Sequence, residues 1–270
     1  MNGQFGEVLL LKKLFIEHHI PKTCVEFGAY DGVTNSNTYY FWEKRGFEAL
    51  LIEPDPNLFQ QLQVNSRKNC TTINEFVSIE NNLSKIIKKH NFPNKIGLLS
   101  IDIDSNDLEI FKLVDHNSTY IVVIEFNNQF PVWVDYSDPD DTIVFRHSAL
   151  AVLKFASKKG YRLLDVKGSN LILINTKNLN LPNSLFPKSL EECFDYSEQK
   201  KACKDIRVIG SKFTTNAKVF SERPGIILKT KKFIFQIILI INYKLRGKLL
   251  PPKIIPENCK KRILDSGLYI

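Results

Sequence analysis

The chain of 270 residues is 43% hydrophobic and 24% charged, which is enough apolar material for a full core and excludes a disordered or fibrous protein. Its formal net charge of +8 is unevenly distributed: residues 1–180 contain 19 Lys and Arg against 21 Asp and Glu, whereas residues 181–270 contain 18 against 8. Because the main body carries no excess of positive charge, we exclude nucleic acid as its partner.

The amino-terminal segment and the cysteines indicate a cytoplasmic protein. Glu7 interrupts the region before the first apolar run and no small-residue cleavage site follows, so we expect an amphipathic helix here instead of a signal peptide. The five cysteines are scattered, and their spacing predicts neither a disulfide framework nor a zinc site.

Short apolar runs alternate with helical patterns as far as residue 126. The runs that predict buried strands are 25–27, 49–52, 71–77, 96–103 and 120–126. The segments that predict helices are 37–45, 56–66, 82–90 and 106–114. This alternation predicts an α/β fold with a doubly wound, mostly parallel sheet of the Rossmann-like class.

An irregular stretch, a helix and a hairpin follow. We expect the helix over residues 147–159 and two strands over 161–166 and 170–175, joined by a Gly-Ser-Asn turn. The chain then divides into a domain over residues 1–180 and a basic carboxyl-terminal extension over 181–270. The apolar run 233–241 is too short to span a bilayer and favours packing or homo-oligomer contact, with contact at the inner membrane surface left open.

Polar residues follow each predicted strand, at the edge of the sheet where such folds bind ligands. The stretch "VEFGAYDGVTNS" has the spacing G-x-x-x-G, not the G-x-G-x-x-G of a dinucleotide site. Glu26 would repel a pyrophosphate but can accept a hydrogen bond from a cationic amino-acid moiety. Glu53, 27 residues further on, can hold both hydroxyls of a ribose. Together they favour S-adenosylmethionine over NAD, and an NAD-dependent reductase ranks last.

At this point the chain resembles the FkbM-type S-adenosylmethionine-dependent methyltransferases, especially members associated with bacterial surface polysaccharides. The segments "VEFGAYDGVTNSNT", "LLIEPDP", "LLSIDIDSNDLEIF" and "IVVIEFN" carry the resemblance, which continues in "HSALAVLKFASKKGYRLLDVKGSNLILIN" and covers residues 23–176. It implies the class I methyltransferase fold. Tyr30 and Ser105 depart from the family's pattern.

The resemblance also implies roles for individual residues. The expected cofactor residues are Glu26, Gly28, Ala29, Asp31 and Gly32 for the methionine portion, Ser36 and Asn37 for its carboxylate, Glu53 and Pro54 for the ribose, Asn74, Glu75 and Phe76 for the adenine, and Asp102 facing cofactor and substrate.

A sugar hydroxyl needs a general base before it can accept a methyl group. We predict Asp104 or His147 as the base, Glu125 as the residue that positions the acceptor, and Asn127 as an orienting amide. A divalent metal held by Asp102, Asp104 and Glu125 is a weaker alternative, because carboxylates at strand ends often cap helices. For His147, a position on the surface beside a helix is the equal alternative.

The segment after residue 126 raises two questions, one about its aromatic residues and one about its aspartates. Its aromatic residues could pack on the core or form a lid that stacks on a sugar ring, and its aspartates favour a solvated turn over a metal site. The residues concerned are Phe130, Trp133, Tyr136 and Phe145 for the first question, and Asp138, Asp140 and Asp141 for the second.

The sequence therefore predicts an O-methyltransferase acting on a sugar hydroxyl of a surface glycan, such as capsule or lipopolysaccharide, or on its nucleotide-activated precursor. The expected partner is a small molecule or a glycan. The alternative is a non-catalytic module that acts through its basic extension on a partner protein or a membrane surface.

Overall fold

The computed structural model describes residues 3–78, 81–103, 106–130, 132, 134–138 and 146–199. Predictions for Asp104, Asp140, Asp141, Trp133, Phe145 and the apolar run 233–241 lie outside these residues. By their contacts, the described residues up to Phe126 and from Leu153 to Phe194 form one compact unit. Those between Asn127 and Val152, with those from Asp195 on, form a second.

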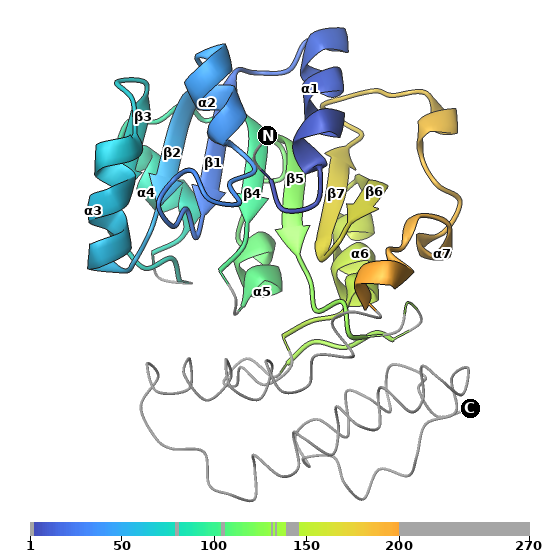
Figure 1. Ribbon diagram of the computed structural model, residues 1–270. Helices are drawn as coiled ribbons and strands as arrows, with labels where there is room; N and C mark the ends of the chain where they lie inside the picture. The colour runs from blue at the N-terminus through green and yellow to red at the C-terminus, as the bar shows by residue number, and fades with distance from the viewer. Residues whose placement is uncertain are drawn as a thin grey trace, which may run out of the picture. The chain divides into compact units, whose positions relative to one another are not determined.

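Seven strands of the described residues form one sheet in the order β3-β2-β1-β4-β5-β7-β6 (Figure 1). Their bounds are β1 Thr23–Phe27, β2 Glu48–Ile52, β3 Cys70–Ile73, β4 Ile96–Ile101, β5 Thr119–Glu125, β6 Tyr161–Lys167 and β7 Asn170–Asn175. The strands β1 to β5 are parallel, as predicted, whereas β7 runs antiparallel between β5 and β6. The predicted mostly parallel α/β sheet is confirmed, and so is its hairpin.

The third strand is shorter than the sequence suggests. The apolar run extends to residue 77, but β3 ends at Ile73, whose carbonyl accepts the backbone N–H of Glu53. The side-chain amide of Asn74 then donates to the carbonyls of Glu53 and Pro54, at 2.8 and 3.0 Å. Because β2 has already ended at Ile52, the ladder has no partner strand to continue along.

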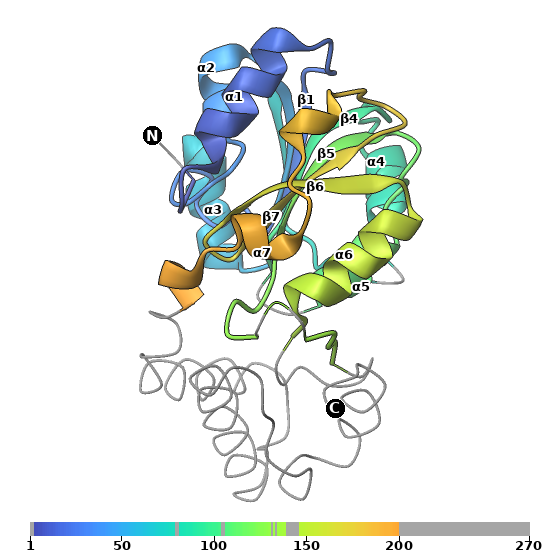
Figure 2. The same ribbon diagram turned by 90° about the vertical axis from the view of Figure 1, so that its right-hand side faces the viewer.

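Helices cover both faces of the sheet (Figure 2). One face carries α1 Glu7–Glu17, α2 Tyr39–Arg45 and α3 Pro56–Asn65, and the other carries α4 Leu83–Lys89, α5 Asp107–Lys112 and α6 Ala149–Lys158. A short 3₁₀ turn, Asn183–Leu185, and α7 Leu190–Cys193 follow the sheet. No described helix combines the length and apolar character needed to cross a bilayer.

Under α1 and α2 the strands present apolar side chains along most of their length. Cys24, Ala49, Leu98 and Ile121 are fully buried there with residues of both helices, such as Leu11. Toward the carboxyl ends of the parallel strands, buried polar side chains such as Glu26 and Ser100 replace them. The sheet thus has a polar carboxyl edge.

Candidate active site

Five residues from five strands fall into one row at this carboxyl edge. The register pairs Phe27 with both Ile52 and Ile101, and pairs Ile101 with Ile124. One residue further along, the parallel strands therefore align Glu53, Gly28, Asp102 and Glu125, and the antiparallel strand adds Asn170 opposite Glu125. We call these five residues the edge row. It crosses the point between β1 and β4 where the strand order reverses, which is where open α/β sheets bind ligands.

Gly28 lies where the backbone is most crowded. Its φ is 68°, and a Cβ atom added to it would lie 1.9 Å from the carbonyl oxygen of Asp102. Any side chain would force β1 and β4 apart at their ends, so this position requires glycine. Since Gly28 has no side chain, no side chain stands between Glu53 and Asp102 in the edge row.

Glu26 organises the segment that leads into α2. Its carboxylate accepts hydrogen bonds from the hydroxyls of Ser36 and Thr38, both at 2.6 Å, and from the backbone N–H of Asn37 at 2.9 Å. Burial raises the pKa of Glu26, and these hydrogen bonds offset part of the rise. In this structure the carboxylate holds the loop, and its contact with a cofactor stays a prediction.

The glycine loop between these points has a fixed shape. The carboxylate of Asp31 accepts from the backbone N–H groups of Val33 and Thr34, at 2.8 and 2.7 Å, and from the Thr34 hydroxyl. Partial burial raises the pKa of Asp31, but these hydrogen bonds outweigh it and leave the pKa below its ordinary value. Gly32, at φ 80°, packs against Leu62, and Tyr30 is 47% exposed.

Glu53 ties the end of β2 to the same loop. One carboxylate oxygen accepts the backbone N–H of Tyr30 at 2.8 Å, and the other accepts that of Asp55 at 2.9 Å. Burial raises the pKa of Glu53, while these two N–H groups lower it. Each oxygen retains a lone pair, so the side chain can still accept hydrogen bonds from a ligand.

Two of the residues predicted to surround the adenine, Glu75 and Phe76, differ in their surroundings. Glu75 forms an ion pair with Lys89 and accepts from the Asn81 amide at 2.9 Å, and Lys89 lowers the pKa of Glu75. Phe76 is 53% exposed, so part of its aromatic side chain faces solvent. Glu75 is therefore committed to α4, and Phe76 offers the apolar surface.

Asn127 and His147 belong to the second compact unit. The backbone N–H of Asn127 donates to the carbonyl of His147 at 2.9 Å, and the Asn127 side-chain oxygen accepts from the backbone of Gln129. His147 is 2% exposed, so the alternative of a surface histidine is wrong. The structure brings the two residues together through backbone atoms, and their roles in the reaction stay predictions.

The aromatic residues of this unit pack on each other. The rings of Phe130 and Tyr136 are stacked at 5.1 Å and are buried. Asp138 is buried too. Its carboxylate accepts hydrogen bonds from the Tyr136 hydroxyl at 2.8 Å and from the backbone N–H of Arg146 at 2.7 Å. The expectation of a solvated turn is wrong for Asp138.

Three polar residues at the edge were not expected from the sequence. The buried carboxylate of Glu7 accepts from the side-chain amide of Asn170 at 2.7 Å and from the backbone of Phe5 at 2.9 Å. The amide of Asn37 donates to the Ser100 hydroxyl at 3.1 Å. A signal for Glu7 exists, since positions 7, 11 and 14 share one helix face and Leu11 and Leu14 are apolar.

Two buried acceptors at this edge lack donors. The side-chain oxygens of Asn37 and Asn170 have no hydrogen-bond partner among the described residues. Together with the remaining lone pairs of the Glu53 carboxylate, they provide acceptors at the edge. Such a set suits a ligand that brings N–H groups or positive charge. Within the described part of the chain, no three His, Cys, Asp or Glu side chains group as a metal site.

No known protein family matches the chain, and no curated protein sequence does. Among solved structures, the glycopeptide N-methyltransferase MtfA complexed with sinefungin is 8% identical, with a TM-score of 0.37 over 64% of this chain and 86% of that one. The same protein complexed with S-adenosyl-L-methionine is also 8% identical, with a TM-score of 0.36 over 63% and 92%. These values are too low to transfer a property, so the functional argument rests on the edge residues.

Proposed function

We propose that the chain is an S-adenosylmethionine-dependent methyltransferase that binds its cofactor across the carboxyl ends of β2, β1 and β4. The observation that supports this most is the edge row, in which Glu53 and Asp102 lie on either side of Gly28 and Glu125 lies beyond Asp102. Such a row repels a pyrophosphate and attracts a cation. The strand order supports it as well, because the antiparallel β7 departs from the 3-2-1-4-5-6 order of dinucleotide-binding folds.

The described residues fit the parts of this cofactor. Glu53 would accept hydrogen bonds from the ribose hydroxyls, and the exposed ring of Phe76 would stack on the adenine. Asn37 was expected at the carboxylate of the cofactor. Because its side-chain oxygen has no donor among the described residues, we assign it instead to the cationic amino group, from which it would accept a hydrogen bond. When bound, the cofactor supplies a methyl group already activated by its sulfonium.

We assign the acceptor, as the FkbM resemblance implies, to a sugar hydroxyl of a surface glycan or its nucleotide-activated precursor. The protein must hold that hydroxyl in line and remove its proton. Glu125 in the edge row would position the acceptor. Asp104 or His147 would take the proton, with Asn127 orienting the group. The reaction would take place in the cytoplasm.

The test is calorimetric titration of the full chain with S-adenosylmethionine, S-adenosylhomocysteine and NAD. We expect binding of the first two, weakened about 10- to 100-fold in Glu53→Gln, because hydrogen bonds to a charged group contribute about 1.5–3 kcal/mol. Glu48→Gln is the matched control, since Glu48 lies on the same strand and is exposed. Its affinities should equal those of the unmodified chain.

Three results would contradict the proposal. These are tighter binding of NAD than of S-adenosylmethionine, absence of binding by both S-adenosyl compounds, and equal loss in the two variants. Once binding is established, transfer of a labelled methyl group to nucleotide sugars and isolated glycans, with magnesium and with a chelator, tests the acceptor and the metal.

A further inference from the structure

The first helix carries apolar side chains on its solvent face as well as on its core face. Val8, Leu11 and Leu14 are buried, as expected for a helix that covers a sheet. Leu9 and Ile16, however, are 55% and 69% exposed. Because residues seven apart lie on the same side of a helix, Leu9 and Ile16 lie on one side of α1, with Lys12 and Lys13 between them. We call Leu9 and Ile16 the aliphatic stripe.

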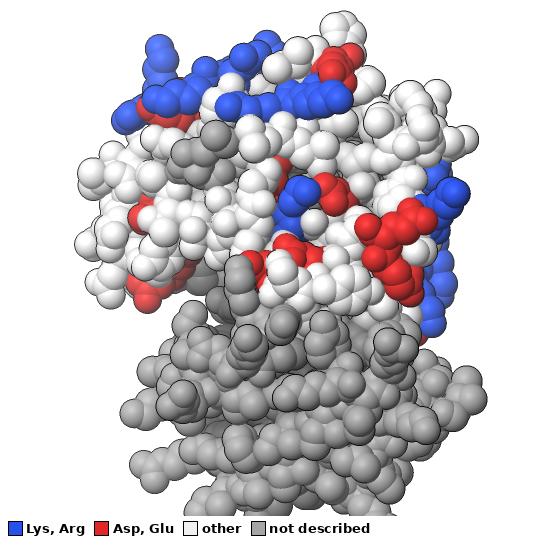
Figure 3. Space-filling view, turned by 45° about the vertical axis from the view of Figure 1, so that its right-hand side comes forward, with Lys and Arg blue, Asp and Glu red and all other residues white. Residues whose placement is uncertain are grey.

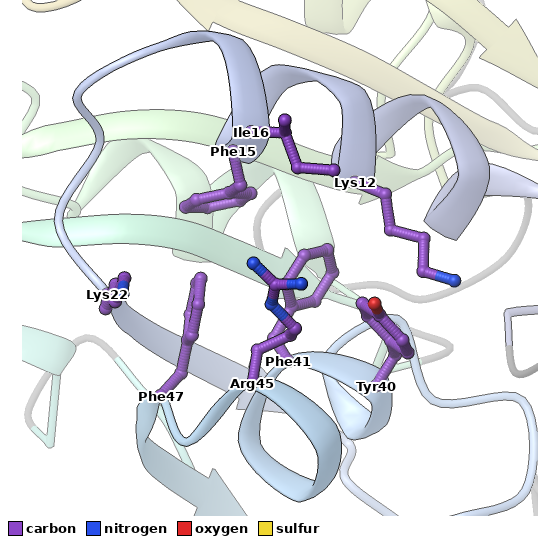
Figure 4. Close-up of a pocket in the computed structure, with 8 residues that line it drawn as sticks. All are labelled: Lys12, Phe15, Ile16, Lys22, Tyr40, Phe41, Arg45 and Phe47. Atoms are coloured by element: carbon purple, nitrogen blue, oxygen red, sulfur yellow. The ribbon is translucent and has the colours of Figure 1, made fainter.

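A small cavity adjoins this stripe between α1 and α2 (Figure 4). Its volume is about 20 Å³, and the aromatic rings of Phe15, Phe41 and Phe47 lie against it, with centroids 4.9 to 5.2 Å apart. Three cationic side chains and a tyrosine complete the lining, Lys12, Lys22, Arg45 and Tyr40. The Lys12 ammonium lies 3.7 Å from the centre of the Tyr40 ring.

Four cations at this end of α1 and α2 form no ion pair with a described carboxylate. Among the described residues, none of Lys12, Lys13, Lys22 and Arg45 forms an ion pair, whereas Glu43 is taken by Lys44 and Arg67. Two other exposed carboxylates, Glu17 and Glu48, lie near these cations in the sequence. Because there are four cations and two such carboxylates, the net charge of this face is positive. In Figure 3 lysine and arginine side chains gather along the top of the described part, the end at which the parallel strands begin. We call Leu9, Ile16 and these four cations the α1 face.

We propose that the α1 face docks the protein on an anionic membrane surface. The aliphatic stripe would enter the headgroup layer, and the cations would meet lipid phosphates. A second copy of the chain fits less well, because a symmetric contact would set the four cations against themselves. Nucleic acid fits less well too, since the exposed side chains of the stripe are aliphatic and give bases no ring to stack on.

The test measures binding of the full chain to vesicles of phosphatidylcholine with and without about 30% phosphatidylglycerol. We expect binding to the anionic vesicles alone, weakened about fivefold for each of Lys12→Ser and Lys13→Ser and about tenfold for Ile16→Ser. The matched controls are Lys88→Ser on α4 and Val64→Ser on α3, which remove an exposed cation and an apolar side chain that is 81% exposed. Both should bind as the unmodified chain does.

Each other outcome overturns the proposal. Absence of vesicle binding, equal binding to neutral vesicles, or unchanged binding by the α1-face variants would show that this face does not dock on anionic lipid. A variant effect on binding of a labelled oligonucleotide, or on dimerisation in sedimentation, without an effect on vesicles would assign the face to nucleic acid or to a second copy. Unchanged melting temperatures would show that the variants fold.

Discussion

At the scale of single residues, Gly28 makes the sharpest prediction because Gly46 provides its control. Both have φ near 67°, but a Cβ atom at Gly28 would lie 1.9 Å from the Asp102 carbonyl, whereas nothing lies within 4 Å of one at Gly46. We expect Gly46→Ala to cost about 1–2 kcal/mol of unfolding free energy, from the backbone conformation alone. Gly28→Ala should cost several kcal/mol, because two strand ends must separate.

Urea denaturation of the two variants measures the difference. Similar losses for Gly28→Ala and Gly46→Ala would mean that the approach of β1 to β4 is looser than described. In that case this position of the edge row would not require glycine.

Glu7 gives a second test at this scale. It is buried and is the acceptor for the Asn170 amide and the Phe5 backbone. Glu7→Ala should lower the unfolding free energy by about 2–3 kcal/mol, because it leaves a buried donor unpaired. Glu17→Ala on the same helix removes an exposed carboxylate and should change it by less than about 0.5 kcal/mol. Equal changes in chemical denaturation would refute a structural role for Glu7.

The polar residues that follow strands could be predicted singly, because a strand end is visible in sequence. Glu26, Glu53, Asp102 and Glu125 each come directly at such an end, and the register aligns the last three in the edge row. Glu7 and Asn170 could not be paired in advance, because 163 residues separate them and only tertiary packing brings them together.

At the scale of elements, the ring of His116 lies where α5, α6 and β6 meet. The ring packs edge-on against Phe111 and Phe155, and its Nδ1 lies 3.4 Å from the Tyr161 hydroxyl. Burial, and then Lys159, lower the pKa of His116 from 6.5 to about 4, against the opposite effect of Asp115. The folded protein thus disfavours the charged ring.

The sign of the pH effect follows from this lowered pKa. Above pH 6.5 the ring is neutral in the folded and the unfolded state. As the pH falls from 6.5 toward 4, the unfolded chain binds a proton at this ring and the folded protein does not. Stability should fall over that window, by less than about 1.4 kcal/mol per pH unit because the ring is partly exposed. His116→Phe should flatten this part of the profile in thermal melts, and His19→Phe, at an exposed position, should not. An unchanged slope in His116→Phe would exclude this origin.

The order and type of the elements follow from periodicity and from their caps. The side chain of Asp55, before Pro56, accepts hydrogen bonds from two backbone N–H groups of α3, and that of Asn82 accepts one from α4. Both helix starts can therefore be predicted from their capping residues. The place of β7 is different. A hairpin is predictable from its turn, but the strand it joins depends on packing across the whole sheet.

At the scale of the whole molecule, the described residues place many of their cations at one end of the sheet and several carboxylates at the other. Cations lie in the last turns of α2, α4, α5 and α6, and carboxylates occupy the edge row at the other end. Cations at helix carboxyl ends are favourable in themselves. The field of the acidic edge should favour S-adenosylmethionine over S-adenosylhomocysteine, which lacks the sulfonium charge.

The ratio of the two affinities should decrease as the salt concentration rises, because the Debye screening length falls to about 3 Å at 1 M. It should shrink as well in Asp102→Asn, but not in Asp115→Asn, which is exposed and precedes β5. Calorimetry at low and high ionic strength measures both effects. A ratio of affinities that is the same at all salt concentrations would mean that the edge row does not contribute through its charge.

The antiparallel β7 has a consequence for the growing chain. Until Asn170–Asn175 have been synthesised, β5 has a neighbour on one side only, and its residues Ile121, Val122, Val123 and Ile124 are among the most apolar of the sheet. A chain that stops after α6 therefore presents an open, hydrophobic strand edge, the kind on which aggregates grow. We expect translation products truncated there to be insoluble, and the nascent chain to need protection on the ribosome until the hairpin emerges.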